Sequence, residues 1–337
     1  MHKVSRHRAA LPSHRIEGTP VSFPHITTQH IRKHVTYQNA IDALREALLA
    51  DVDPAEDFDR KILGLPDGKQ LLFMPSQSSR WVGSKLISVN PNNTARNKSR
   101  VQGLYLLMDA DTTTPQVVID GNELTSIRAA AVSMLVADIV LGRDPGELLV
   151  YGYGAQARSH TLALKEIRPR MGRLIVHGRR PERAEMFAAN ASEHGWFART
   201  GCAVDPDVAA GQSDVIVTAT GASEPLFDSE AVRPGTLVLA IGSHNHDQRE
   251  LDSKLIARSN VVVEDVNTAM REAGDIVLAA KEGAITAEEL IPLRDLIRGE
   301  RKLDSSKPTV FKSVGMSWED LVVAGEIYER VPTAALR

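Results

Sequence analysis

The sequence is poor in several residue types on which whole classes of protein depend. Cys202 is the single cysteine among 337 residues, which excludes an internal disulfide and a cysteine-based metal site. We expect it to be a small buried residue or a surface thiol. Aromatic residues make up only 4% of the chain, too few for a surface that stacks single-stranded bases. The net charge of -3 argues against a nucleic-acid surface as the main partner.

The N-terminal segment also lacks a long apolar run. Its first 25 residues contain Lys3, Arg6, Arg8 and Arg15 without an apolar core, so we expect neither a signal peptide nor a membrane span there. This arm is compatible with loose order and with packing on a partner subunit. The chain as a whole, 42% hydrophobic and 25% charged, has an ordinary globular balance and enough length for two domains. A reducing cytoplasm is the consistent compartment.

The most informative stretch is residues 148–157, which read LLVYGYGAQA. An apolar run stops at a glycine pair and passes directly into a segment that favours a helix, which predicts a strand, a tight turn and a helix start. A glycine pattern of this kind is weak alone. A second apolar run, at residues 173–177, follows after a gap of one helix, as a βαβ unit requires. The context therefore predicts a dinucleotide-binding turn.

Each small residue of this turn has a physical role. Gly152 lets the turn close, Gly154 lets the backbone approach a ligand without a Cβ, and Ala157 keeps the helix close to its strand. The helix starts at Ala155 and Gln156, where free N–H groups of the first turn favour a diphosphate. We therefore assign cofactor binding to these positions.

The chain divides into two patterns around this turn. A helix is expected over residues 27–50, and short strands with turn-rich spacers follow, which indicates an antiparallel or mixed sheet. After a helix over residues 125–141, strands and helices alternate as in a doubly wound parallel sheet. The predicted fold class is α/β: a Rossmann-type parallel sheet plus a discontinuous α+β domain. The expected parts are an arm (1–25), a substrate-binding and dimerisation domain (26–128 and 314–337) and an NAD(P)-binding Rossmann domain (129–313).

The end of the second parallel strand bears on which nucleotide binds. NAD sites usually place an acidic residue there for the ribose 2′-OH, whereas a 2′-phosphate needs cations. Here His177 and Gly178 lead into Arg179 and Arg180, with no carboxylate before Glu182. Two arginines favour NADP(H) over NAD(H). The alternative, a solvated arginine loop, stays open.

Five ordered blocks together resemble the ornithine cyclodeaminase/μ-crystallin family. They are residues 103–109, the LTSIRAAA block at 124–131, the Gly152 loop, AIGS at 240–243 followed by RELD at 249–252, and FKSVG at 311–315. The similarity covers roughly residues 35–330. It implies a homodimer whose first domain both dimerises and holds the substrate, and a Rossmann domain that binds NAD(P). Members of the family interconvert α-amino acids and α-imino acids by hydride transfer.

The resemblance places Arg60, Lys85 and Arg128 where the family holds the substrate carboxylate. The chemistry agrees, since hydride delivery requires the imine carbon to be fixed and a bidentate guanidinium fixes the adjacent carboxylate. A lysine near two arginines in a dry pocket has a lowered pKa, which suits proton transfer at the amine nitrogen. The alternatives are that Arg60 is a surface loop arginine, that Lys85 lies on an edge strand with its ammonium group in solvent, and that Arg128 is a surface helix arginine.

Further residues take roles from the same resemblance. Thr218 is assigned to the adenine side of the cofactor, and Ser313 and Gly315 to the nicotinamide side. Ala129 departs from the family, which often has threonine there, and a hydroxyl near the diphosphate is lost.

The position of His244 is a second departure, since ornithine cyclodeaminases carry an aspartate there. A neutral imidazole cannot both attract a cationic amine and take its proton, which argues against ring closure. His244 can instead serve as a general acid. With His246 and Asp247 it does not make a convincing ligand set, so no metal is expected.

The sequence thus predicts an NADP(H)-preferring reductase or dehydrogenase that acts on an imine beside a carboxylate, with a small amino-acid or imino-acid substrate and neither nucleic acid nor membrane as partner. Two alternatives stay open. One is a cyclodeaminase that converts ornithine to proline and ammonia. The other is a non-catalytic, NADPH-dependent binder of small carboxylated ligands.

Overall fold

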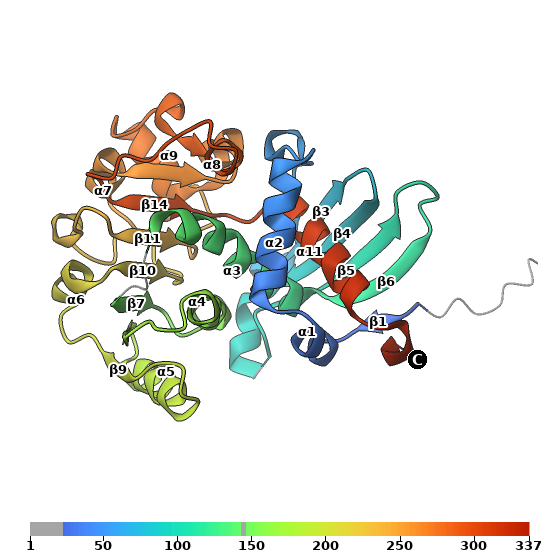
Figure 1. The fold of residues 1–337 in the computed structure, drawn as a ribbon, viewed down its shortest axis with the longest axis horizontal. Helices are drawn as coiled ribbons and strands as arrows, with labels where there is room; N and C mark the ends of the chain where they lie inside the picture. Colours follow the sequence, from blue (N-terminus) through green and yellow to red (C-terminus); the bar gives the residue numbers. More distant parts are fainter. Residues whose placement is uncertain (1–22, 97, 143–145, 337) are drawn as a thin grey trace, which may run out of the picture.

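The computed structural model describes residues 23–96, 98–142 and 146–336. Two sheets organise this part of the chain, one of six strands and one of eight, and they form two lobes side by side (Figure 1). The predictions for the N-terminal arm lie almost entirely outside the described residues. Within the described part, no helix is both long and apolar enough to cross a bilayer.

The eight-stranded sheet is parallel throughout, in the order β13-β12-β14-β11-β10-β7-β8-β9. Alternate residues of its strands enter two separate apolar clusters, one shared with α3, α4 and α5 and the other with α6, α7 and α9. Both faces are therefore covered, which explains why the strands are continuous apolar runs. This confirms the predicted doubly wound sheet. Its strands are β7 (Glu147–Tyr151), β8 (Arg173–His177), β9 (Arg199–Cys202), β10 (Val215–Thr218), β11 (Leu237–Ala240), β12 (Asn260–Val263), β13 (Ile291–Pro292) and β14 (Thr309–Lys312).

Helices connect these strands along both faces of the sheet. They are α4 (Ala155–Ile167), α5 (Pro181–Glu193), α6 (Pro206–Gln212), α7 (Ser253–Arg258), α8 (Val266–Glu272), α9 (Gly274–Lys281) and α10 (Leu293–Ile297). The strand order runs outward in both directions from β7, with β8 on one side and β10 on the other. Ligands of open α/β sheets bind at such a switch point, beyond the carboxyl ends of the strands.

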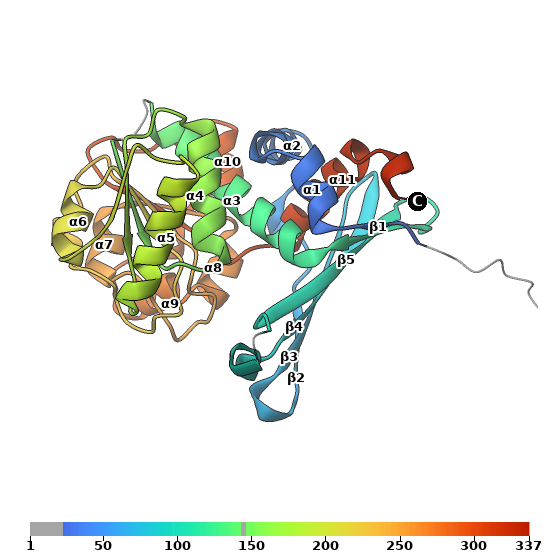
Figure 2. The same cartoon turned by 90° about the horizontal axis from the view of Figure 1, so that it is seen from below.

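The six-stranded sheet has the order β1-β6-β5-β4-β3-β2 and is antiparallel except where β1 joins β6. Its strands β2 to β5 project as a long arm away from the helices (Figure 2). One face of the sheet is covered by α11, which comes from the far end of the chain and makes this lobe discontinuous, as predicted. The elements are β1 (His25–Ile26), β2 (Lys61–Gly64), β3 (Gln70–Gln77), β4 (Trp81–Val89), β5 (Val101–Asp109), β6 (Pro115–Asp120), α1 (Thr28–His34), α2 (Tyr37–Leu49) and α11 (Ser317–Arg330).

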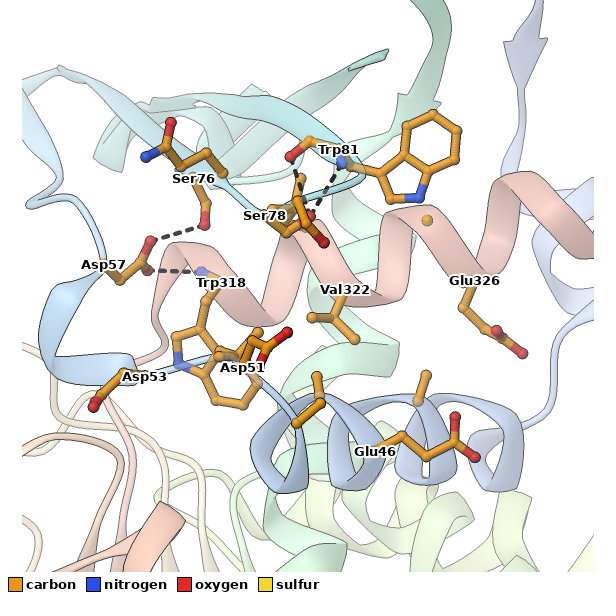
Figure 3. A pocket seen from close by; sticks show the side chains of 18 of the residues that line it. Glu46, Asp51, Asp53, Asp57, Ser76, Ser78, Trp81, Trp318, Val322 and Glu326 are labelled. Atoms are coloured by element: carbon orange, nitrogen blue, oxygen red, sulfur yellow. Dashed lines mark hydrogen bonds between the residues drawn. The ribbon is translucent and has the colours of Figure 1, made fainter. Parts of the chain in front are cut away.

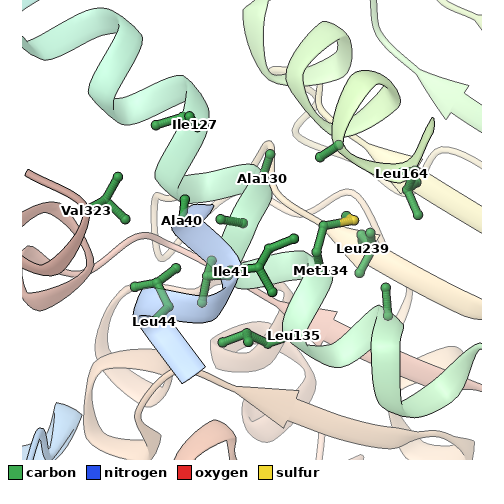
Figure 4. Close-up of a cluster of buried hydrophobic side chains, with 14 of the residues drawn as sticks. Ala40, Ile41, Leu44, Ile127, Ala130, Met134, Leu135, Leu164, Leu239 and Val323 are labelled. Atoms are coloured by element: carbon green, nitrogen blue, oxygen red, sulfur yellow. The ribbon is translucent and has the colours of Figure 1, made fainter. Parts of the chain in front are cut away.

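Helix α3 (Gly121–Val140) joins the two lobes and is buried almost all round. Figure 4 shows Ile127 on the side of Val323 of α11, and Met134 on the side of Leu239 and Leu164 of the other lobe. A helix with apolar contacts on every side lacks an amphipathic stripe. The predicted domain boundary after residue 128 lies inside this helix, and the two boundaries stay predictions.

Two local predictions need correction. The helix expected over residues 27–50 is two helices, because Thr36 caps a new start after α1 ends. Helix α3 begins at Gly121 and not near Thr125, because the Asp120 carboxylate accepts hydrogen bonds from the backbone N–H groups of Asn122 and Glu123 at 2.9 and 3.0 Å. An Asp in this position is a strong N-cap.

Candidate functional site

The glycine turn after β7 has the geometry of a nucleotide loop. Gly152 has a φ of +111°, and a Cβ there would lie 2.5 Å from the carbonyl oxygen of Ala219, so only glycine fits without strain. Gly154 is the N-cap of α4 and has open space on its Cβ side. No side chain caps this 13-residue helix, and its positive end at Ala155 and Gln156 is available to an anion.

A basic pocket of about 390 Å³ lies beside this turn. It is lined by Arg179 and Arg180 after β8, by Arg183 in α5 and by Tyr153 of the glycine turn. The Arg183 guanidinium lies 6.0 Å from the Tyr153 ring centroid. The sequence prediction missed Arg183, although its position three residues after Arg180 on a helix start was a signal for a shared face. The pocket lining contains no carboxylate, so these residues fit a phosphate group.

One buried carboxylate, that of Glu250, hydrogen-bonds both turns that follow β10 and β11. It accepts hydrogen bonds from the Thr218 hydroxyl at 3.0 Å and from the backbone N–H groups of Thr220 and Gly242, both at 2.7 Å. Burial raises the pKa of Glu250. The Thr218 hydroxyl is therefore already hydrogen-bonded to Glu250. A ligand would meet Thr218 because this residue lies at the end of β10.

The loop after β14 is held in the same way by Glu264. The Ser313 hydroxyl donates to Glu264 Oε1 at 2.6 Å, and the Gly315 N–H donates to both carboxylate oxygens at 3.0 and 3.1 Å. Gly315 has a φ of +76°, and a Cβ there would lie 2.4 Å from Nη1 of Arg128. The bare Gly315 backbone thus lets this loop from one lobe lie against an arginine from the helix that joins them.

Four charged side chains meet next to that loop. Lys85 of β4 and Arg128 of α3 face Glu319 and Asp320 of α11, and the exposed fraction of each is 6% or less. Lys85 Nζ lies 2.8 and 2.7 Å from the two Asp320 oxygens. Arg128 donates to Asp320 from Nε at 3.1 Å and to Glu319 from Nη1 at 2.6 Å. We call these four residues the cation centre.

Burial controls the ionisation of the cation centre. Loss of solvation, with a smaller contribution from the charge of Arg128, outweighs the opposing effect of Asp320 and lowers the pKa of Lys85 to about 8. Burial also opposes the charge of Arg128, but Asp320 and Glu319 outweigh it and raise the pKa of Arg128. Burial raises the pKa of Glu319 well above its ordinary value, with help from the charge of Glu264. At neutral pH Lys85 is a proton donor close to its own pKa.

The structure brings Lys85 and Arg128 together, but it places Arg60 differently. Arg60 donates to the Gly315 carbonyl oxygen at 2.7 Å and pairs with Glu272 of α8 at 2.9 Å. It therefore contacts the same loop as Arg128 without joining the cation centre. The neighbouring Asp59 pairs with Arg271 at 2.7 Å, so two ion pairs link the lobes here.

His244 lies on an exposed turn beyond β11, with Nδ1 3.3 Å from the Gly242 carbonyl oxygen. Loss of solvation and then the charges of Arg60 and Lys312 lower its pKa. The neutral imidazole is therefore more abundant at pH 7 than in an ordinary histidine, which makes His244 a poorer proton donor. Across the described ranges, no three His, Cys, Asp or Glu side chains gather as a metal site would need.

Sequence reasoning missed Asp320 and Glu319, which complete the cation centre. Both lie in the first turn of α11, where acidic residues are common because they complement the helix dipole. Their signal was therefore indistinguishable from an ordinary helix start. Only the return of α11 onto β4 and α3 gives them buried cationic partners.

Comparisons with known proteins agree with this geometry. A Delta(1)-pyrroline-2-carboxylate reductase of Paracoccus denitrificans is 32% identical over 301 residues, which are 87% of this chain and 92% of that protein. A Delta(1)-pyrroline-2-carboxylate/Delta(1)-piperideine-2-carboxylate reductase of Azospirillum brasilense is 34% identical over 78% and 81% of the two chains. The solved Thermococcus litoralis Delta(1)-pyrroline-2-carboxylate reductase, in complex with NADH and L-proline, has a TM-score of 0.85 at 26% identity over 93% of this chain and 99% of its own. Because the model of the ornithine cyclodeaminase/mu-crystallin family also matches residues 26–334, the chain belongs to that family.

Proposed function

We propose that this protein is an NAD(P)H-dependent reductase that converts a cyclic α-imino acid, such as Delta(1)-pyrroline-2-carboxylate, into the corresponding amino acid. The observation that carries the proposal is the buried Lys85 beside Arg128, next to the loop at the cofactor edge of the parallel sheet. A proton donor and a carboxylate clamp side by side are what an imine next to a carboxylate requires. The relatives described above carry names for this reaction.

Arg128 binds the substrate carboxylate in this proposal. Its Nε and Nη1 are held by Asp320 and Glu319, which fixes the plane of the guanidinium and leaves Nη2 to the substrate. Arg60 reaches the same carboxylate from the loop before β2 once it leaves Glu272 of the other lobe. Fixing the carboxylate fixes the neighbouring imine carbon as well.

Lys85 supplies the proton. Reduction of C=N adds one hydride to carbon and one proton to nitrogen, and the reduced nicotinamide, when bound, supplies the hydride. Because its pKa of about 8 lies only slightly above pH 7, Lys85 is mostly protonated at that pH and can still release its proton. We also assign a substrate contact to His244, because it lies close enough to Arg60 for the arginine charge to lower the His244 pKa.

We assign the cofactor to the glycine turn and its neighbours. Gly152, Gly154, Ala155 and Gln156 hold the diphosphate, Thr218 lies toward the adenine side, and Ser313 and Gly315 lie toward the nicotinamide. Support comes from the positive φ of Gly152 and the open side of Gly154.

Arg179, Arg180 and Arg183 select NADP(H) over NAD(H) by pairing with the 2′-phosphate. Replacing Arg179 and Arg180 together by alanine should raise the KM for NADPH at least about tenfold and leave the KM for NADH within about twofold, since one charge-assisted pair contributes about 1.5–3 kcal/mol. An equal rise for both cofactors would show that the arginines do not read the 2′-phosphate.

The projecting arm of the six-stranded sheet supports the proposal of a homodimer. Large apolar side chains on β2, β3 and β5 are 36–53% exposed: Ile62, Leu63, Phe73, Val101 and Leu104. By strand register Leu63, Phe73 and Leu104 lie on one face of the arm and Ile62 and Val101 on the other. Exposed apolar surfaces often mark interaction sites. We propose that the arm, and with it the lobe of residues 26–128 and 314–337, pairs with a second copy, while residues 129–313 bind the cofactor. Ile62→Glu combined with Phe73→Glu should yield monomers by light scattering, and an unchanged mass would place the interface elsewhere.

The test of function measures cofactor absorbance with cyclic ketimine carboxylates, and with keto acids plus amines. Consumption of NADPH with a cyclic imine, lost in Lys85→Met, supports the proposal. Formation of proline and ammonia from ornithine without imine reduction would instead indicate the cyclodeaminase. Binding of ligand and cofactor without turnover would indicate the non-catalytic binder.

A further inference from the structure

A buried tyrosine lies beside the cation centre with an unused hydroxyl group. Tyr105 of β5 is fully buried, and its Oη has no hydrogen-bond partner among the residues described. Buried polar groups are nearly always hydrogen-bonded, and an exception calls for a reason. Phenylalanine would fill the same space without this penalty.

The sheet register places this hydroxyl between two rows of polar residues. Tyr105 is paired directly with Lys85 on β4, and its Oη lies 2.3 Å from where a Cβ of Gly83 would be. Gly83 is in turn paired with Ser76 on β3. Directly paired residues have Cβ atoms about 4.5–5.5 Å apart, so the hydroxyl lies next to Ser76. Any side chain at position 83 would displace it.

Ser76 leads to a carboxylate at the surface of the lobe. Its hydroxyl donates to Asp57 Oδ1 at 2.8 Å, and Asp57 Oδ2 accepts from the Trp318 backbone N–H at 2.7 Å. Asp57 lines a groove of about 480 Å³ between α2, α11 and the β3-β4 hairpin. Figure 3 shows both hydrogen bonds, with Asp51 and Asp53 also in the groove wall. Asp57 is thus the innermost acid of a groove that opens to solvent.

Tyr105 also lies within the field of the cation centre. Burial raises the pKa of Tyr105 well above its ordinary value, and the charges of Asp320 and then Asp57 add to the effect. Burial likewise raises the pKa of Asp57, which keeps a proton on it at higher pH than usual. The Tyr105 hydroxyl therefore interacts electrostatically with both the carboxylate that pairs with Lys85 and the carboxylate that faces the groove.

The proposed reaction creates a need for such a connection. Lys85 is 0% exposed and gives up one proton in each reduction. We propose that Tyr105 passes protons from Asp57, at the groove, to Asp320 and so back to Lys85. The inference rests on the proposed reductase function.

The transfers balance as a chain of proton exchanges without a change of oxidation state. The Asp320 carboxylate receives the Tyr105 hydroxyl proton and passes it on to neutral Lys85. Tyr105 regains a proton from Asp57, and Asp57 takes one from water in the groove. Because Oη has no hydrogen-bond partner among the described residues, the relay requires a bridging water molecule on either side of it.

Tyr105→Phe tests the relay because it removes only the hydroxyl. Since Lys85 starts protonated, a single turnover with prebound NADPH should stay within about twofold of wild type. Steady-state kcat should fall about 10–100-fold, with a larger solvent deuterium isotope effect, because reprotonation becomes limiting. Asp57→Asn should give the same pattern. The control is Tyr328→Phe in α11, whose hydroxyl bonds Gln116 at 3.2 Å and whose loss should leave kcat unchanged.

Thermal unfolding separates the relay from a structural role. Tyr105→Phe should unfold at or above the wild-type temperature, because no hydrogen bond within the described part of the protein is lost. An unchanged steady-state kcat and solvent isotope effect in a folded Tyr105→Phe would overturn the relay. An equal loss in single-turnover and steady-state rates would also overturn it and make Tyr105 a positioning residue for Lys85. If the wild-type protein reduces no imine, the proposed function itself fails, and the relay with it.

Discussion

Replacement of Asp320 by asparagine is the sharpest test of the cation centre. Asparagine keeps the shape and one acceptor oxygen but removes the charge that Lys85 meets at 2.7 Å and Arg128 at 3.1 Å. Two unit charges about 4 Å apart interact by about 4 kcal/mol at an effective dielectric constant of about 20. This corresponds to a loss of about a thousandfold in the proton affinity of Lys85.

The starting point is a Lys85 pKa of about 8, so about 90% of the wild-type molecules carry the proton at pH 7. After a thousandfold loss of affinity about 1% would carry it. We expect kcat/KM for imine reduction at pH 7 to fall about 100-fold, with the alkaline limb of its pH profile displaced well toward acid. The unfolding free energy should fall by about 3–5 kcal/mol, as when one partner of a buried ion pair is removed.

The assay is kcat/KM against pH from cofactor absorbance, together with urea unfolding of the same preparations. The control is Glu282→Gln, which removes a surface carboxylate that pairs with Arg249 at 2.9 Å and should change neither quantity appreciably. A folded Asp320→Asn protein whose pH profile coincides with that of wild type would refute the assignment of Lys85 as proton donor held by Asp320. The wild-type protein itself should gain stability as pH rises from about 8 to about 10.5, because in that window Lys85 binds its proton only when unfolded.

Three further predictions concern the loops around the site. Gly152→Ala should lower the unfolding free energy by about 1–3 kcal/mol and abolish NADPH binding, because its Cβ would press on the Ala219 carbonyl oxygen. Thermal unfolding reports the loss of stability and fluorescence titration the loss of binding. Normal NADPH binding would place the diphosphate elsewhere. Gly315→Ala should raise the substrate KM more than the cofactor KM, since the new Cβ would displace the Arg128 guanidinium. Steady-state kinetics, with substrate and cofactor varied in turn, measures the two KM values. An equal change in both would argue against Arg128 as the residue that binds the substrate carboxylate. His244→Ala should reduce kcat less than about tenfold, because a neutral imidazole at the pocket edge contributes less than a general acid; a larger loss would make His244 the proton donor.

The parallel sheet was predictable because its signals are local. The buried strands read as short apolar runs, and the turn at Gly152 needs glycine for a reason that involves only a few neighbouring residues. The start of α3 was placed too late because Asp120 and Thr125 are both acceptable N-caps in sequence. Thr125 instead donates to the Gly121 carbonyl oxygen and accepts from Lys85. A lysine contact 40 residues away cannot be read from a cap pattern.

The sequence by itself determined the class of fold and predicted the nucleotide turn and two of the cations, Lys85 and Arg128, because each depends on local pattern or on family blocks. The tertiary structure alone decided what those cations meet. Asp320 and Glu319 come from a helix about 190 residues further along than Arg128, and Tyr105 faces Lys85 only through strand pairing. The pKa of a buried group depends on which charges surround it after folding, and those neighbours are set by long-range packing that no local pattern encodes.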